Sequence, residues 1–84
     1  MSNSPRILIY GASGYTGKLV AECLAQRDMP FYFAGRNQDK LEASLAIVEE
    51  RLGRKAPATI VQAANSREEL LPWFDKVEVV INVA

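Results

Sequence analysis

The chain has 84 residues, with 10 lysines and arginines, 10 aspartates and glutamates and no histidine, so its formal net charge is zero. A chain of this length allows one domain, and the balanced charge argues against a surface for nucleic acid or anionic membranes. The lack of histidine excludes Ser-His-Asp and Cys-His catalysis within these residues, and a single cysteine adds no ligand set for a metal. No apolar run reaches the roughly 18 residues of a membrane span and no signal-peptide pattern is present, so we expect a cytoplasmic location.

The first third of the chain predicts a strand, a helix and a second strand. Residues 6–10 form a short β-branched apolar run that ends at Gly11, which is typical of a strand buried on both faces. A helix is predicted from Thr16 to Asp28, and a second strand over residues 31–34. The apolar residues that we expect to face the sheet from this helix are Leu19, Val20, Cys23 and Leu24.

A second helix is predicted over residues 39–52, with Asn37 or Asp39 as its cap and Gly53 at its end. Its expected buried stripe consists of Leu41, Leu45, Val48 and Leu52. The third strand is predicted over residues 59–63.

A third helix begins with the capping-box spacing of Ser66 and Glu69, and Pro72 should kink or split it. We expect its buried face to carry Leu70, Leu71 and Phe74. Residues 77–83 are almost entirely apolar and predict a last strand.

The order β-α-β-α-β-α-β indicates an α/β fold of the Rossmann type, with about four parallel strands and helices on both faces. We expect the spatial order third, second, first, fourth, which puts the apolar strand 77–83 at an edge. An exposed apolar edge is an aggregation hazard. We therefore expect residues 1–84 to be a dinucleotide-binding domain at the N-terminus of a longer chain, or this edge to pair with another molecule in a homo-oligomer.

A glycine-rich turn lies between the first strand and the first helix. Its sequence, Gly11-Ala-Ser-Gly-Tyr-Thr-Gly17, has the spacing G-x-x-G-x-x-G. Glycines there let the chain turn sharply, let a phosphate approach the backbone and let the helix pack closely on the sheet. The amide groups and dipole of the helix then suit the diphosphate of a dinucleotide. The residues that we expect to contact it are Gly11, Ser13, Gly14, Tyr15, Thr16 and Gly17.

The turn has two other interpretations. A P-loop for ATP or GTP is disfavoured, because Ala12 stands where its first glycine should be and Leu19 stands where its Ser or Thr should be. A tight turn without a ligand remains an alternative.

The end of the second strand indicates which dinucleotide is bound. A pocket for NAD usually carries an Asp or Glu there, whereas this chain has Gly35-Arg36-Asn37. The guanidinium of Arg36 can pair with a 2′-phosphate, and Asn37 and Lys40 can add contacts. The sequence therefore predicts NADP. Asn82, at the carboxyl end of the last strand, can contact the ribose or nicotinamide, or can be a structural amide.

These motifs together resemble the N-terminal NADP-binding domain of the saccharopine dehydrogenase-like oxidoreductases, including the trans-acting enoyl reductase branch. The resemblance covers nearly the whole chain and is carried by the glycine turn with Lys18-Leu19-Val20, by residues 34–37, by Lys40-Leu41 and by residues 79–84. It implies that Ala64-Asn65 approaches the adenine, without the acidic residue common there in the family. It also implies a substrate-side domain after the last strand.

The resulting hypothesis is an NADP(H)-binding domain of an oxidoreductase, in which residues outside this chain hold a small-molecule substrate for hydride transfer. No catalytic residue is assigned, and these 84 residues alone should be inactive. One alternative is a non-catalytic NADP-sensing module. Another is a domain of the N-acetyl-γ-glutamyl-phosphate reductase type, which the glycine turn also resembles. A structural scaffold without nucleotide affinity is the third.

Overall fold

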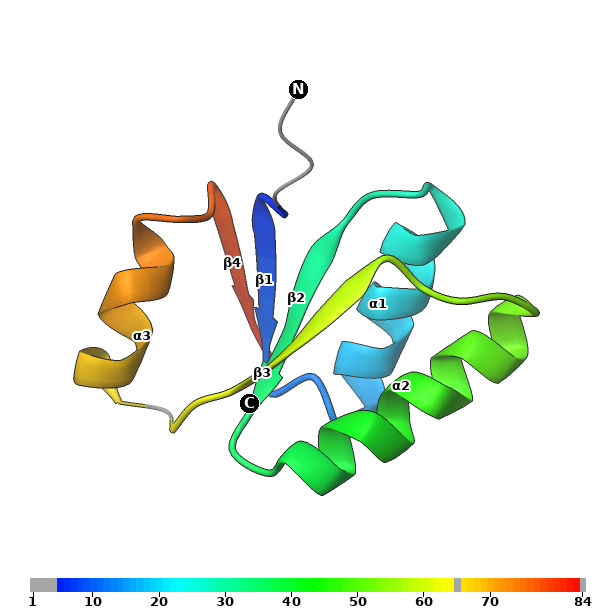
Figure 1. Cartoon of the computed structure of the whole chain (residues 1–84), viewed down its shortest axis with the longest axis horizontal. Coiled ribbons are helices and arrows are strands. Elements are labelled where there is room, and N and C mark those ends of the chain that lie inside the picture. The colour runs from blue at the N-terminus through cyan, green and yellow to red at the C-terminus, as the bar shows by residue number, and fades with distance from the viewer. Residues whose placement is uncertain (1–4, 65, 84) are drawn as a thin grey trace.

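The computed structural model describes residues 5–64 and 66–83. Seven elements alternate along the chain as predicted (Figure 1). They are β1 (Ile7–Tyr10), α1 (Tyr15–Gln26), β2 (Phe31–Gly35), α2 (Gln38–Leu52), β3 (Ala58–Gln62), α3 (Arg67–Phe74) and β4 (Val79–Asn82).

The four strands form one parallel sheet in the order β3-β2-β1-β4, which confirms the predicted topology. Ile7 pairs with Phe31 of β2 and with Val79 of β4, and Phe31 pairs in turn with Ala58 of β3. Because all strands run the same way, their carboxyl ends meet at one edge of the sheet, where parallel α/β sheets bind ligands.

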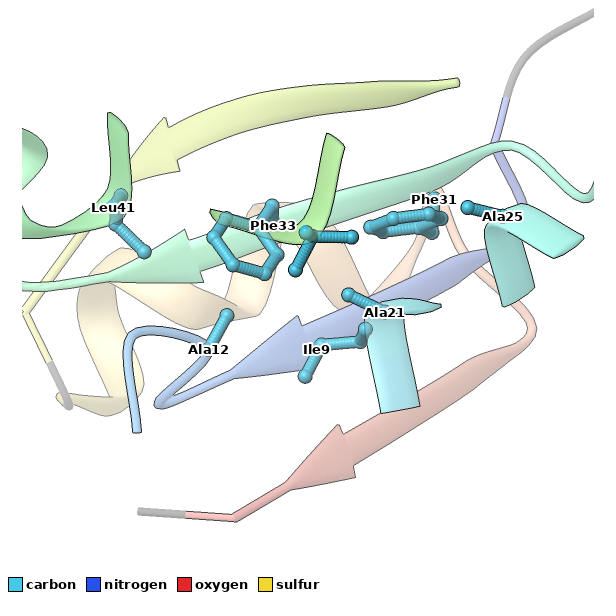
Figure 2. Close-up of a cluster of buried hydrophobic side chains, with 8 residues drawn as sticks. Ile9, Ala12, Ala21, Ala25, Phe31, Phe33 and Leu41 are labelled. Carbon is cyan, nitrogen blue, oxygen red and sulfur yellow. The ribbon is translucent and has the colours of Figure 1, made fainter. Parts of the chain in front are cut away.

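Helices cover both faces of the sheet, with α1 and α2 on one side and α3 on the other (Figure 1). The larger core cluster lies under α1 and α2, where Phe31 and Phe33 of β2 contact small and branched side chains (Figure 2). Its other buried members are Ile9, Ala12, Ala21, Ala25, Leu41 and Val48. The α3 face has a second cluster of Leu8, Tyr10, Ala34, Val61, Ala63, Leu70 and Val77.

The prediction for the buried face of α1 was wrong for Leu19 and Cys23 and is confirmed for Val20 and Leu24, which pack against the core. The residues that face the sheet are the small ones, Gly17, Ala21 and Ala25, whereas Leu19 and Cys23 are exposed. Val20 and Leu24 are half-buried at the flank. At Gly17 the physical reason is the close approach of α1 to the backbone of Ala12, which leaves no room for a side chain, while Ala21 and Ala25 share the core with the large rings of Phe31 and Phe33.

The prediction for α2 is confirmed, with Leu41 and Val48 buried and Leu45 and Leu52 packed beside them. The side chain of Asn37 accepts a hydrogen bond from the Lys40 N–H (3.1 Å) and caps the helix start. Gly53 ends the helix in the left-handed conformation, with φ of 79°.

The predictions for α3 and β4 are confirmed only in part. Ser66 caps α3 through the Glu69 N–H, but Pro72 lies inside a single helix that ends two residues later, so the helix is not split. Of its three predicted apolar residues, Leu70 is buried whereas Leu71 and Phe74 are exposed, because within the described part of the chain no other helix covers this face.

β4 is shorter than the predicted strand, and among residues 5–64 and 66–83 it pairs with β1 alone, so it forms an edge as expected. Val79 and Val80 on it are 48% and 39% exposed. The self-association predicted through residues 77–83 stays a prediction.

Candidate dinucleotide site

A cleft of about 550 Å³ lies at the carboxyl edge of the sheet, between the glycine turn after β1 and the loop after β2. Its lining residues are Tyr10, Gly11, Ser13, Gly35, Arg36, Asn37 and Lys40. The turn and the Arg36 loop, which the sequence singles out for the diphosphate and the 2′-phosphate, therefore border the same cleft.

Gly11 supplies the sharp turn at the end of β1. Its φ is 80°, a conformation that residues with a side chain rarely adopt. The N–H groups of Gly11 and Ala12 both donate to the Ala34 carbonyl, each at 3.0 Å. The turn is thus fixed to β2 just before the loop that carries Arg36.

Gly17 lets α1 pack closely on that turn. A Cβ atom built there would lie 2.6 Å from both the Cα and the carbonyl oxygen of Ala12, both backbone atoms. Real Cβ atoms do not approach so closely. The position therefore requires glycine for packing alone.

Gly14 differs from both of these glycines. Its φ of −78° suits any residue, and a Cβ there would meet nothing nearer than the Gly11 carbonyl oxygen at 3.5 Å. The fold has room for a side chain at this exposed position. A glycine there keeps the main chain at the helix start accessible, as close approach of a diphosphate requires.

The start of α1 also offers free hydrogen-bond donors. Gly14 donates to the Gly11 carbonyl and accepts from the Lys18 N–H, but no hydrogen bond from the Tyr15, Thr16 or Gly17 N–H is found in the described chain. The first N–H groups of a helix have no partner within it, and the positive end of the helix dipole adds to their attraction for anions. These amides fit a phosphate group.

Ser13 is held in place from α2. The hydroxyl of Ser44 donates to the Ser13 carbonyl at 3.2 Å, so α2 fixes the middle of the turn. The sequence reasoning missed Ser44, although a polar residue between the buried positions Leu41 and Val48 is a signal that could have found it.

The loop after β2 gives the cleft its positive charge. Arg36 and Lys40 line it, no carboxylate does, and the guanidinium of Arg36 makes no ion pair with any described residue. The Arg36 carbonyl accepts a hydrogen bond from the Gln62 side-chain amide at 3.2 Å. A second recess of about 360 Å³ adjoins the cleft and is lined by Arg36, Asn37, Gln38, Asp39 and Gln62.

Tyr10 forms part of the cleft wall and was also missed as a site residue. It is 2% exposed, and its hydroxyl donates to the Ala63 carbonyl at 2.9 Å. Burial raises the pKa of its phenol, an effect that the positive charge of Arg36 opposes and the negative charge of Glu69 reinforces. The phenol is therefore a neutral hydrogen-bond donor at pH 7.

Gly35 is the other lining residue that sequence reasoning did not assign. A Cβ built there would lie 3.1 Å from the Leu41 Cδ2 atom, so a side chain would crowd the start of α2.

The remaining predicted residues lie outside the lining of the cleft, and Gly14 and Gly17 are among them. Tyr15 and Thr16 are exposed in the first turn of α1, and Asn82 is exposed at the end of β4, where it pairs with Tyr10 in the ladder. Their contacts with a cofactor stay predictions. Ala64 is half-buried, and the predicted approach of Asn65 to adenine lies outside the described residues.

The described residues contain no group of three metal-ligating side chains, and none of their helices has the length and apolar character of a membrane span. They do combine a cleft lined by Gly11, Ser13 and the cations Arg36 and Lys40 with main-chain donors at the start of α1, directly after that turn. These groups fit a dinucleotide with a phosphorylated ribose: amides for a diphosphate and a guanidinium for a 2′-phosphate.

Comparison with known proteins supports the same assignment. Residues 7–84 match the family described as the saccharopine dehydrogenase NADP binding domain. A Caenorhabditis elegans protein named lipid droplet localized protein is 33% identical over 82 residues, covering 90% of this chain and 19% of that protein. A Rattus norvegicus saccharopine dehydrogenase-like oxidoreductase is 35% identical over 57 residues, covering 58% of this chain and 13% of its own length.

Solved structures agree on the fold. The bulky-bulky ketone specific alcohol dehydrogenase of Comamonas testosteroni superposes with a TM-score of 0.65 at 20% identity, covering 94% of this chain and 34% of that one. The chain spans less than a fifth of the curated relatives it matches. The match over residues 7–84 establishes that the chain belongs to the saccharopine dehydrogenase NADP-binding domain family, with NADP as its cofactor.

Proposed function

We propose that the cleft between the glycine turn and the Arg36 loop is where this domain holds NADP(H) for an oxidoreductase. The single observation that carries the proposal is that the glycine turn, through Gly11 and Ser13, lines one cleft with the unpaired Arg36, while the helix that follows this turn begins with amides that have no partner among the described residues. The bound nicotinamide would supply the hydride chemistry. The residues of this chain bind and orient the cofactor.

The two ends of the cleft would bind different parts of the cofactor. The amides of Tyr15, Thr16 and Gly17 donate to the diphosphate, and the exposed backbone of Gly14 permits its approach. Arg36 pairs with the 2′-phosphate, while Lys40 adds positive charge. Asn37 uses its side-chain oxygen to cap α2 and retains its NH₂ group for the ligand.

We further propose that residues 1–84 serve as the dinucleotide-binding domain of a longer oxidoreductase and that its substrate is held by residues outside this chain. Two observations support this. The described residues include no histidine, and of the two candidate acids or bases in the cleft, the Tyr10 hydroxyl is already bonded to Ala63 and Lys40 is assigned to the 2′-phosphate. The oxidoreductase relative is also several times longer than the part that this chain matches. Membership of the family favours neither the sensing module nor the N-acetyl-γ-glutamyl-phosphate reductase type.

The test of the proposed site is Arg36→Ala in the intact protein, with NADPH and NADH titrated in parallel. Hydrogen bonds to charged groups contribute about 1.5–3 kcal/mol, so NADPH should bind about 10- to 100-fold more weakly. NADH should be nearly unaffected because it lacks the 2′-phosphate. Arg27→Ala is the matched control, since Arg27 is an exposed arginine at the end of α1 with no ion pair among the described residues. Equal losses for the two nucleotides would refute the assignment of Arg36.

We also propose a cytoplasmic location, since the sequence shows neither a membrane-span run nor a signal-peptide pattern. The relative named lipid droplet localized protein suggests a different location, on lipid droplets. A fluorescent fusion of the intact protein should be diffuse in cells loaded with fatty acid. Rings around lipid droplets would contradict the proposed location.

A further inference from the structure

We infer that Tyr10 is a positioning residue, which holds the main chain of Arg36 in place and so increases the preference for NADP over NAD. The inference rests on the proposed function, because it takes Arg36 as the group that binds the 2′-phosphate. It concerns a residue that does not itself need to touch the cofactor.

The Tyr10 side chain links strands that are not neighbours. Tyr10 ends β1, whereas its hydroxyl bonds to the carbonyl of Ala63 just after β3, and β2 lies between these two strands. The β2 residue that pairs with Tyr10 is Ala34, which belongs to the same buried cluster and carries only a methyl group. The small side chain leaves room for the phenol ring to cross β2.

The segment that Tyr10 anchors holds the Arg36 loop directly. The Ala63 N–H donates to the Gly35 carbonyl at 2.9 Å, and the Gln62 side-chain amide donates to the Arg36 carbonyl at 3.2 Å. Two consecutive carbonyl groups, the second on Arg36 itself, are therefore bonded to the end of β3. These bonds therefore hold the main chain at the point where Arg36 leaves β2.

The hydroxyl is the informative part of this side chain. Phenylalanine would fill a core position without a polar atom to satisfy, as Phe31 and Phe33 do on the other face. Burying a hydroxyl is unfavourable unless it is hydrogen-bonded, and here it is bonded to one specific carbonyl beside the cleft. The charge of Arg36 also acts on the pKa of this phenol, which places the two groups in one electrostatic environment.

The first experiment compares Tyr10→Phe with the unmodified intact protein by titrating NADPH and NADH. The measured quantity is the ratio of the NADH to the NADPH dissociation constant. A neutral hydrogen bond contributes about 0.5–1.5 kcal/mol, so the ratio should fall about 2- to 10-fold. Tyr32→Phe is the matched control, because Tyr32 lies on the same face, packs against Trp73 and makes no hydroxyl hydrogen bond within the described residues. A purely structural role would weaken both nucleotides equally and leave the ratio unchanged.

The second experiment repeats the substitution in an Arg36→Ala background. If Tyr10 acts through Arg36, Tyr10→Phe should then leave the ratio unaltered, because the group that it positions is gone. Gln62→Ala, at an exposed position, should lower the ratio in the same way and provides the test if Tyr10→Phe fails to fold.

The outcomes separate the two claims. A ratio that falls with Arg36→Ala but is unchanged by Tyr10→Phe, or by Gln62→Ala where the tyrosine variant does not fold, overturns the positioning role alone. A ratio unchanged by Arg36→Ala overturns the proposed site, and this inference with it.

Discussion

The two sides of the cleft recognise a ligand with different parts of the chain. The glycine turn offers main-chain N–H groups. The lack of side chains at Gly14 and Gly17 matters because it leaves space for a ligand and for the close packing of α1. The Arg36 loop offers side-chain cations on a main chain that is bonded to β3. The diphosphate is common to NAD and NADP, whereas the 2′-phosphate is not. The comparison therefore predicts that changes in the turn affect both nucleotides and that changes in the loop discriminate between them.

Within the turn, the same substitution should destabilise the fold much more at Gly17 than at Gly14. Gly17→Ala forces a methyl group to 2.6 Å from the backbone of Ala12, so it should destabilise the fold by about 3 kcal/mol, the upper end of the usual range for overpacking. Gly14→Ala meets no such contact and should cost about 1 kcal/mol at most, through the weaker N-cap. Urea unfolding of the two variants measures the difference. Equal destabilisation would contradict the roles assigned to the two glycines.

A larger side chain at Gly14 tests whether the turn is the binding surface. Gly14→Val should keep the fold, yet its side chain would occupy the space through which a diphosphate approaches the amides of α1. NADPH and NADH should both lose about 10-fold or more in affinity, by the same factor, since about 1.4 kcal/mol corresponds to tenfold. Fluorescence titration with both nucleotides measures this. Unchanged binding would show that the turn is not the site.

A smaller effect is expected when the hydrogen bond from the Ser44 hydroxyl to the Ser13 carbonyl is removed. Ser44→Ala removes the hydrogen bond that holds the middle of the turn, so both nucleotides should bind about 2- to 10-fold more weakly and stability should fall by about 1 kcal/mol. Ser66→Ala is the control, because the loss of its cap on α3 should cost a similar free energy without affecting nucleotide binding. Selective loss of NADPH in the Ser44 variant would contradict a role in the turn.

The fold was largely predictable because its signals are local. Alternating apolar runs and helical stripes define the parallel sheet, and Asn37, Gly53 and Ser66 mark the helix ends at which the structure places caps. The buried face of α1 was not predictable from hydrophobicity alone. The residues that fit against the sheet, Gly17, Ala21 and Ala25, are small rather than strongly apolar. The larger Leu19 and the Cys23 side chain are exposed instead.

The site was predictable where binding a cofactor requires a residue type that the fold alone would not require at that position. The glycine spacing and the arginine after β2 are such residues, and the structure brings Gly11, Ser13 and Arg36 to one cleft. Tyr10, Ser44 and Gln62 were missed because each acts through a hydrogen bond to a main-chain atom far away in the sequence. No local pattern specifies such a bond.

The central claim is that one cofactor bridges the two sides of this cleft. Its most direct test is a crystal structure of the intact protein grown with NADP. We predict the diphosphate at hydrogen-bond distance from the N–H groups at the start of α1 and the 2′-phosphate against the guanidinium of Arg36. A cofactor bound elsewhere, or a 2′-phosphate that points away from Arg36 into solvent, would contradict the account.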